Sequence, residues 1–223
     1  MHTPARSGRE IAYGIGAYAA YLVVRQLTWT DRGRQRASRN AEKIAAFEAD
    51  IGIGCEASVQ RAALAVPRLV DVLNAGYAAG NVALSVGWLL RLYRRRDPAF
   101  RRERTAALLA FGGALPFFAA FPTAPPRTLD GIVDTLAERG WSLDHPVLVK
   151  FYNPIAAMPS HHVAFAVVTG FGLAGRARTP LRRTAWRAYP AAVALVVLAT
   201  GNHFVADVVG GAALGATARR VSR

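Results

Sequence analysis

The chain has 223 residues, which is enough for one domain or a small helix bundle. Apolar residues make up 52% of it and the mean hydropathy is +0.19, although the net charge is +14. The charges gather between apolar runs, as in membrane proteins, and do not form the basic stripe of a soluble nucleic-acid-binding fold. We therefore expect no nucleic-acid partner. Cys55 is the only cysteine, so an intrachain disulfide is excluded.

Six apolar segments are long enough to cross or enter hydrocarbon, at about 1.5 Å per helical residue. They cover residues 11–29, 69–90, 106–121, 163–175, 188–200 and 203–218. The first segment could instead be a signal peptide, but its many tyrosines and the lack of an obvious cleavage site favour a retained helix. The sequence thus predicts an all-α, polytopic membrane helix bundle with five to six transmembrane helices.

An amphipathic helix is expected between the first two segments. Ile44, Phe47 and Ile51 recur at spacings of three and four residues, which suits a helix lying in the membrane interface or packed on the bundle. Glu48 and Glu56 are most simply read as part of a solvated face, and a role in a site is the alternative. We expect residues 1–66 to contain the first span and this helix.

Two further local features are expected along the chain. Gly76, Gly80 and Gly87 in the second apolar segment predict close packing of that helix against a neighbour. Residues 129–139 have apolar positions at helical spacing, so a short helix is expected there.

Polar, titratable residues lie at the ends of the last apolar segments. Pro159, Ser160, His161 and His162 precede one segment, and the pair formed by His203 and Asp207 opens the last one. Ionisable groups at the edge of hydrocarbon are costly and usually mark a site. Residues four apart share a helix face, so the carboxylate could orient one imidazole nitrogen and leave the other as a nucleophile. The alternative is a His–Asp pair that only packs helices.

These motifs together carry a family resemblance. Pro-Ser-x-His at 159–162 and His-x-x-x-Asp at 203–207 resemble signature motifs of the type 2 phosphatidic acid phosphatase (PAP2) superfamily. The stretch 121–127, which ends in Pro-Pro-Arg127, is similar to its inositol phosphorylceramide synthase-like branch. The resemblance covers roughly residues 105–218, and it implies that residues 67–223 form a catalytic membrane bundle.

The resemblance implies a role for each matching residue. His203 would attack phosphorus to form a phosphohistidine, with Asp207 orienting it, and His162 would protonate the leaving oxygen. His161 is an alternative acid, although the motif spacing favours His162. Ser160 and Arg127 would bind the phosphate, helped by backbone amides at the helix start.

The sequence also departs from the superfamily pattern. Ala120 stands where the first motif would have a lysine, and residues 197–202 hold no arginine ahead of the histidine. Phosphoryl transfer needs positive charge on the equatorial oxygens. Lys150, Asn202 or Arg139 could substitute, and Lys150 is favoured because it lies close to residues 152–154.

The expected function is that of a lipid phosphatase acting through a phosphohistidine, without cofactor or metal. Its partners would be a lipid phosphate and the surrounding membrane lipids. The alternative enzyme is a phospho-headgroup transferase that passes a phosphoryl-alcohol group to a lipid hydroxyl. Two other classes remain open: a metal site built from the histidines and Asp207, and a non-catalytic membrane protein.

Arginine placement predicts an orientation in the cell membrane. With six spans, the N-terminus, residues 91–104, residues 176–187 and the C-terminus share one side and hold 17 of the 28 basic residues. The positive-inside rule puts that side in the cytoplasm and the predicted site on the non-cytoplasmic side. Residues 30–43, which carry five basic side chains, conflict with this assignment because they would also lie outside.

Overall fold

The structure confirms an all-α fold. It is a computed structural model that describes residues 4–223, with side chains described from Ser7 onward, so the first three residues of the expected 1–66 unit lie outside the described part. Within that part there is no β-strand, and one isolated parallel bridge joins Thr123 to Ala156.

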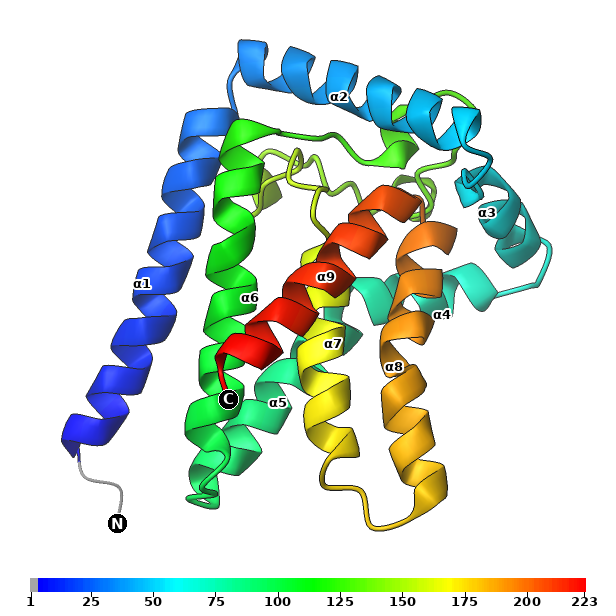
Figure 1. The fold of residues 1–223 in the computed structure, drawn as a ribbon. Helices are drawn as coiled ribbons and strands as arrows, with labels where there is room; N and C mark the ends of the chain where they lie inside the picture. The colour runs from blue at the N-terminus through cyan, green and yellow to red at the C-terminus, as the bar shows by residue number, and fades with distance from the viewer. Residues whose placement is uncertain (1–3) are drawn as a thin grey trace.

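The long helices follow the apolar segments (Figure 1). They are α1 (Pro4–Thr28), α2 (Asp31–Asp50), α3 (Glu56–Leu64), α4 (Leu69–Ala75), α5 (Asn81–Arg94), α6 (Phe100–Ala120), α7 (His161–Ala174), α8 (Pro180–Ala199) and α9 (Val205–Val221). A π-helical stretch, η1 (Gly76–Gly80), joins α4 to α5. The connection after α6 contains three short 3₁₀ turns: η2 (Pro126–Thr128), η3 (Ala137–Arg139) and η4 (Leu148–Lys150).

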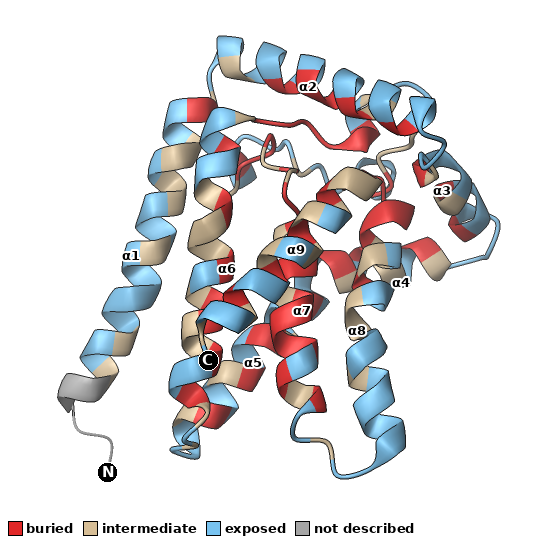
Figure 2. Ribbon diagram, viewed as in Figure 1, coloured by how far each residue is buried: buried red, intermediate tan, exposed pale blue. Residues whose placement is uncertain are grey.

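Helix α7 is the central element of the bundle. It contacts α5, α6, α8 and α9, and most of its residues are buried (Figure 2). A helix that is apolar on all sides is expected to be surrounded in this way. Helix α1 packs along α6, while α2 lies across the end of the bundle at which α7 and α9 begin (Figure 1).

Small residues allow α7 and α9 to approach closely. A Cβ atom on Gly211 would lie 2.4 Å from the Ser160 carbonyl oxygen, and one on Gly215 would lie 2.6 Å from that of Ala164. The expectation for the second apolar segment was wrong: Gly76 and Gly87 have open space where a Cβ would be. The close contacts lie instead where α9 crosses α7.

The buried face of α2 differs from the expected one. Thr30 caps the helix by accepting a hydrogen bond from the Gly33 amide, and Ala37, Ala41 and Ile44 form the buried apolar face. Phe47 and Ile51 are exposed on another face. Because Ala37 and Ala41 are small, α2 can lie close to the chain beneath it. The helix therefore buries this alanine face and leaves Phe47 and Ile51 exposed.

The helix expected at residues 129–139 does not form. Only η3 is helical there, because the Asp134 carboxylate accepts hydrogen bonds from the amides of Leu136 and Ala137. Such local side-chain bonds compete with the helical pattern. Gly131 and Gly140, both at positive φ, bound the segment as turns.

Among the residues that the structure describes, one continuous helical stretch, Leu69–Arg94, is both long enough and apolar enough to cross a membrane. The other predicted spans are helices: α1, α6, α7, α8 and α9. Helix α7 is strongly apolar, but has only 14 residues.

The basic loops gather at one end of the bundle. Contacts across that end join the N-terminal helix, the α5–α6 and α7–α8 loops and the C-terminus: Ser7–Tyr93, Arg104–Glu10, Arg176–Asp97 and Arg219–Glu103. The opposite end carries the 121–157 connection and α2 (Figure 1). The basic residues of 30–43 therefore lie at this opposite end, where they count against the positive-inside assignment.

Candidate active site

Backbone hydrogen bonds bring three segments together at the α2 end of the bundle. These segments are residues 121–128, 153–160 and 200–207, which contain the three motifs. The bonds that join them run from Thr123 N to Ile155 O (2.9 Å), from Arg127 N to Gly201 O (2.8 Å) and from Ser160 N to Asp207 O (3.0 Å). The relative positions of the motif side chains are thus set by main-chain contacts.

His203 and Asp207 form a buried pair at the start of α9. The Asp207 carboxylate accepts hydrogen bonds from the Phe204 amide (2.9 Å) and from His203 Nδ1 (3.2 Å) through Oδ2. His203 lies before the helix, with Phe204 as the N-cap and Asp207 as the third helical residue. The expectation that both lie on one helical face was therefore wrong, because the carboxylate reaches back to cap the helix.

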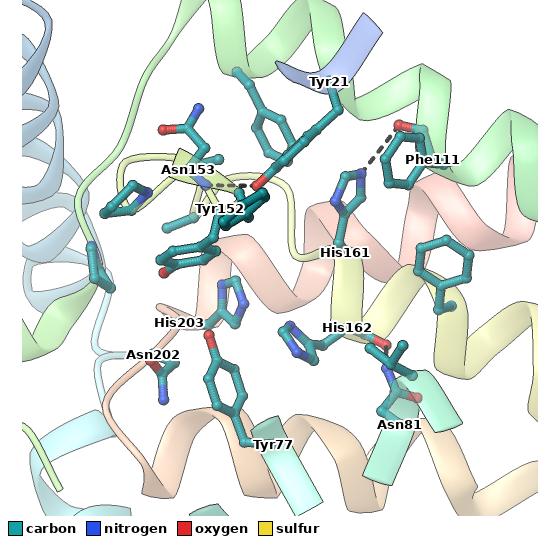
Figure 3. A pocket seen from close by; sticks show the side chains of 18 of the residues that line it. Tyr21, Tyr77, Asn81, Phe111, Tyr152, Asn153, His161, His162, Asn202 and His203 are labelled. Atoms are coloured by element: carbon teal, nitrogen blue, oxygen red, sulfur yellow. Dashed lines mark hydrogen bonds between the residues drawn. The ribbon is translucent and has the colours of Figure 1, made fainter. Parts of the chain in front are cut away.

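His162 faces His203 across a small cavity. Their ring centroids are 5.8 Å apart, and both side chains line a cavity of about 270 Å³ (Figure 3). His162 lies in the first turn of α7 and its ring stacks on Tyr77 at 4.4 Å. The Asn81 amide group donates to the His162 carbonyl oxygen (3.0 Å), which ties this turn to α5. The two imidazoles can contact the same bound group.

His161 points to a different part of the cavity lining. Its ring stacks on Phe111 at 5.0 Å, and Nε2 donates a hydrogen bond to the Phe111 carbonyl oxygen (3.2 Å; Figure 3). That bond and the stacking hold the His161 ring against α6. Of the two adjacent histidines, His162 is the one whose ring faces His203.

Ser160 acts as the N-cap of α7. Its hydroxyl oxygen accepts from the Val163 amide (3.3 Å), and the side chain is fully buried. The oxygen satisfies one of the free amides of the first turn. Ser160 is not part of the cavity lining, unlike the two histidines that follow it.

Arg127 is a buried cation held by polar partners. Nη1 donates to Asn202 Oδ1 (2.6 Å) and Nε to Asp134 Oδ2 (3.1 Å), while the buried Nη2 has no hydrogen-bond partner. Burial acts to lower its pKa, but Tyr152, Tyr77 and Asp134 outweigh it, so the pKa is raised. Arg127 stays charged beside the cavity.

Comparison with protein families shows which superfamily this chain belongs to. The family model described as PAP2 superfamily matches residues 42–220. The chain belongs to the PAP2 superfamily. Membership supports a phosphatase-type phosphoryl-transfer function. The comparisons with curated proteins and with solved structures gave no match.

The PAP2 match extends N-terminally into α2 and includes α3, and one glutamate from each helix binds the start of α9. Glu56 accepts from the Val205 amide (2.8 Å) and Glu48 from the Ala206 amide (2.6 Å). Together with Asp207 they bind three consecutive amides at the start of α9, where negative charge is stabilised by the helix dipole. The expectation of a solvated face was wrong for both. The one signal in the sequence that could have predicted burial of Glu48 is its position four residues after Ile44, on the same face of the helix.

Two of the predicted substitutes for the missing PAP2 cations lie away from the cavity. Lys150 is exposed at the end of η4, and Arg139 is exposed and paired with Asp71. Asn202 does line the cavity, but its oxygen binds Arg127. Among the described residues, no lysine or arginine lines this cavity.

The residues proposed for a metal site are divided in this PAP2 fold. His161 is turned toward Phe111, whereas His203 binds Asp207. Within residues 4–223 no group of three or more His, Cys, Asp or Glu residues is arranged to hold a metal ion.

Proposed function

We propose that this PAP2 protein is an integral membrane lipid phosphatase that works through a phosphohistidine at His203. The observation that carries the proposal is the His203–Asp207 pair, which faces His162 at 5.8 Å across one cavity. The Asp207 carboxylate holds the hydrogen on Nδ1. Because that bond defines the tautomer, Nε2 keeps the lone pair needed for attack.

In the first step His203 Nε2 attacks phosphorus and the bond from phosphorus to the lipid oxygen breaks. His162 gives its proton to that oxygen, which leaves as the alcohol. The positive charge that develops on the His203 ring is stabilised by Asp207. Covalent catalysis divides one difficult displacement into two easier ones.

In the second step water attacks the phosphohistidine. His162, now neutral, takes a proton from the water as the new P–O bond forms and the P–N bond breaks. Inorganic phosphate leaves, and the two histidines return to their initial protonation states. One residue thus serves as acid in the first step and as base in the second.

An apolar groove supports a lipid substrate. It has a volume of about 610 Å³ and lies between α1, α5 and α6. Tyr18, Phe111 and Phe165 line both this groove and the catalytic cavity. A lipid whose phosphate lies at His203 would therefore have a continuous apolar surface for an acyl chain, as lipid-binding clefts require.

A transferase remains the second candidate because residues 121–127 are similar to the inositol phosphorylceramide synthase-like branch. In that reaction an alcohol would replace water in the second step. The chemistry at His203 and His162 would be the same, so the products distinguish the two enzymes.

Purified protein in lipid nanodiscs should be incubated with lipid phosphates of short and long acyl chain, with and without an alcohol acceptor. Free phosphate indicates a phosphatase, and a new phosphodiester indicates a transferase. Brief incubation with ³²P-labelled substrate should trap acid-labile, base-stable label on the protein. Activity in excess chelator would exclude a required metal.

His203→Ala should abolish both turnover and the trapped label, because it removes the nitrogen proposed to attack phosphorus. Asp207→Asn should retain a weak rate, since the carboxylate orients the ring but does not attack. Full activity of the His203 variant, with an unchanged thermal unfolding midpoint, would disprove the covalent mechanism.

A further inference from the structure

The catalytic cavity lacks the cations that stabilise a phosphoryl group in transfer. Ala120 stands where a lysine is expected, residues 197–202 hold no arginine, and neither Lys150 nor Arg139 lines the cavity. The negative charge on the equatorial oxygens of the phosphoryl group must nevertheless be stabilised by hydrogen-bond donors. The described lining offers four tyrosines in their place: Tyr18, Tyr21, Tyr77 and Tyr152.

Two of these tyrosines hold the loop that covers the cavity. The Tyr18 hydroxyl donates to the Phe151 carbonyl oxygen (2.9 Å), and the Tyr21 hydroxyl accepts from the Asn153 amide (2.7 Å; Figure 3). Both hydroxyls are thus bound to the main chain of residues 151–153. Tyr77 and Tyr152 interact instead with side chains, Tyr77 with Tyr152 and Tyr152 also with Arg127, and a bound anion can replace these contacts.

Tyr77 is presented by an unusual piece of backbone. It lies in η1, the π-helical stretch between α4 and α5, and π-helical turns within α-helices are frequent at functional sites. Its ring is buried and stacks on His162 at 4.4 Å. In Figure 3 its hydroxyl points toward His203. Tyr77 therefore contacts the proposed acid and faces the proposed nucleophile.

Tyr152 connects the cavity to the buried cation. Its side chain interacts with both Tyr77 and Arg127. Arg127 does not line the cavity itself, and its Nη2 is buried without a hydrogen-bond partner. The nearest carboxylate to this nitrogen is that of Asp144, at 4.0 Å, so the guanidinium and the two phenols next to it remain available as donors for a single anion.

Neutral donors suit a cavity at the edge of hydrocarbon. A lysine and a further arginine would have to be desolvated there, whereas a phenol donates without carrying a charge. Arg127, which binds Asp134 and Asn202, supplies positive charge from outside the cavity lining.

We propose that the hydroxyls of Tyr77 and Tyr152 bind the non-bridging oxygens of the substrate phosphoryl group, in place of the two cations missing from the PAP2 motifs. This inference rests on the proposed phosphoryl-transfer function. Each phenol donates its O–H to a phosphoryl oxygen, and no proton is transferred.

The test compares Tyr77→Phe, Tyr152→Phe and the double variant with wild type. Phenylalanine keeps the ring and hence the packing on His162. Two quantities are measured in nanodiscs: kcat and KM for a lipid phosphate, and the affinity for vanadate or inorganic phosphate. Thr184→Val is the control, because it also removes one hydroxyl but Thr184 is exposed on α8 and does not line this cavity.

Each single variant should lose about 100-fold in kcat, as when one donor of an oxyanion site is removed. KM should change less, because the charge on the oxygens is redistributed in the transition state. Vanadate should bind more weakly to both single variants and most weakly to the double variant, while Thr184→Val should bind it as wild type does.

Wild-type kcat and vanadate affinity in both single variants would overturn the proposal. Failure of the enzyme assignment would look different: wild type would release no phosphate from any lipid phosphate. Anion affinity in the four proteins would still decide whether the two hydroxyls bind phosphate. A variant with a lowered unfolding midpoint would be assayed below that temperature, so the comparison remains between folded proteins.

Discussion

His162 and His161 are adjacent in the chain but have different surroundings. His162 stacks on Tyr77 and faces His203, whereas His161 gives its N–H to the Phe111 carbonyl oxygen. Two neighbouring residues on a helix point about 100° apart, so one can face the substrate while the other packs against α6. This difference separates the proposed acid from its neighbour and leads to a kinetic prediction.

His162→Ala should impair hydrolysis of a lipid phosphate far more than that of an aryl phosphate. A lipid alcohol leaves poorly without a proton, while p-nitrophenolate hardly needs one. The loss on the lipid should be about 100- to 10,000-fold, the usual contribution of general acid catalysis. The measured quantity is the ratio of the hydrolysis rate on the lipid phosphate to that on the aryl phosphate. His161→Ala should keep the wild-type ratio; if it alone shows the leaving-group dependence, the acid has been assigned to the wrong histidine.

The crossing of α7 and α9 positions the two histidines proposed to be catalytic, since each lies at the start of one helix. Gly211 is buried at this crossing, and a Cβ there would meet the Ser160 carbonyl oxygen at 2.4 Å. Ser160 is bonded through its amide to the Asp207 carbonyl oxygen. Any widening of the crossing would therefore move Ser160 and Asp207 apart.

Gly211→Ala should destabilise the protein by about 1–3 kcal/mol, the usual cost of overpacking. It should also lower kcat, because the helix starts separate. Gly87→Ala is the matched control: Gly87 is exposed in α5 with no atom near a new Cβ, so this change should not lower stability. Thermal unfolding and kcat are compared. Equal stability of the two variants would contradict the close crossing.

The start of α9 depends on carboxylates from two other helices. Glu48 comes from α2 and faces Glu56 and Cys55 near α3 and Asp207 in α9. Burial, together with the nearby Glu56, raises the pKa of Glu48 from 4.5 to about 8. The folded protein therefore holds a proton on Glu48 that the unfolded chain releases at lower pH.

Stability should consequently fall as pH rises from about 4.5 to about 8, since the folded state binds more protons over this window. The contribution of Glu48 is fully present below the unfolded pKa and lost above the folded one. Glu48→Gln still accepts from the Ala206 amide but cannot ionise, so it should reduce this slope. Thermal unfolding midpoints at pH 5, 6.5 and 8 give this slope for each variant. Glu42→Gln, an exposed change on the same helix, should keep the wild-type slope.

Charge is distributed unevenly over the whole bundle. Arginines of the α5–α6 and α7–α8 loops lie at one end, together with both ends of the chain that the structure describes. The candidate site lies at the other end, beneath α2 and the 121–157 connection (Figure 1). By the positive-inside rule we propose that the site faces away from the cytoplasm.

Single cysteines in a Cys55→Ser background test this orientation in intact cells. Glu138→Cys and Arg39→Cys, both exposed at the site end, should react with a membrane-impermeant maleimide. Pro98→Cys, exposed in the α5–α6 loop, should react only after permeabilisation. The reverse pattern would place the site in the cytoplasm. Opposite labelling of Arg39→Cys and Glu138→Cys would contradict the position of α2 in the structure.

The sequence by itself determined the helices and the motif residues. Long apolar runs can satisfy their backbone only as helices in hydrocarbon, so an all-α fold followed from composition and period. The positions of His162, His203, Asp207 and Arg127 were visible because each lies in a short motif beside an apolar run. Local spacing carries this information without any tertiary contact.

Only the tertiary structure decided which other residues reach the cavity. Lys150 was favoured because it is near residues 152–154 in the chain, but it is exposed. Tyr77, far away in the sequence, stacks on His162 because η1 leads directly into α5, which packs beside α7. Glu48 likewise reaches the Ala206 amide across 158 residues. Such contacts depend on how helices cross, and crossing is set by small residues such as Gly211 that have no periodic signal of their own.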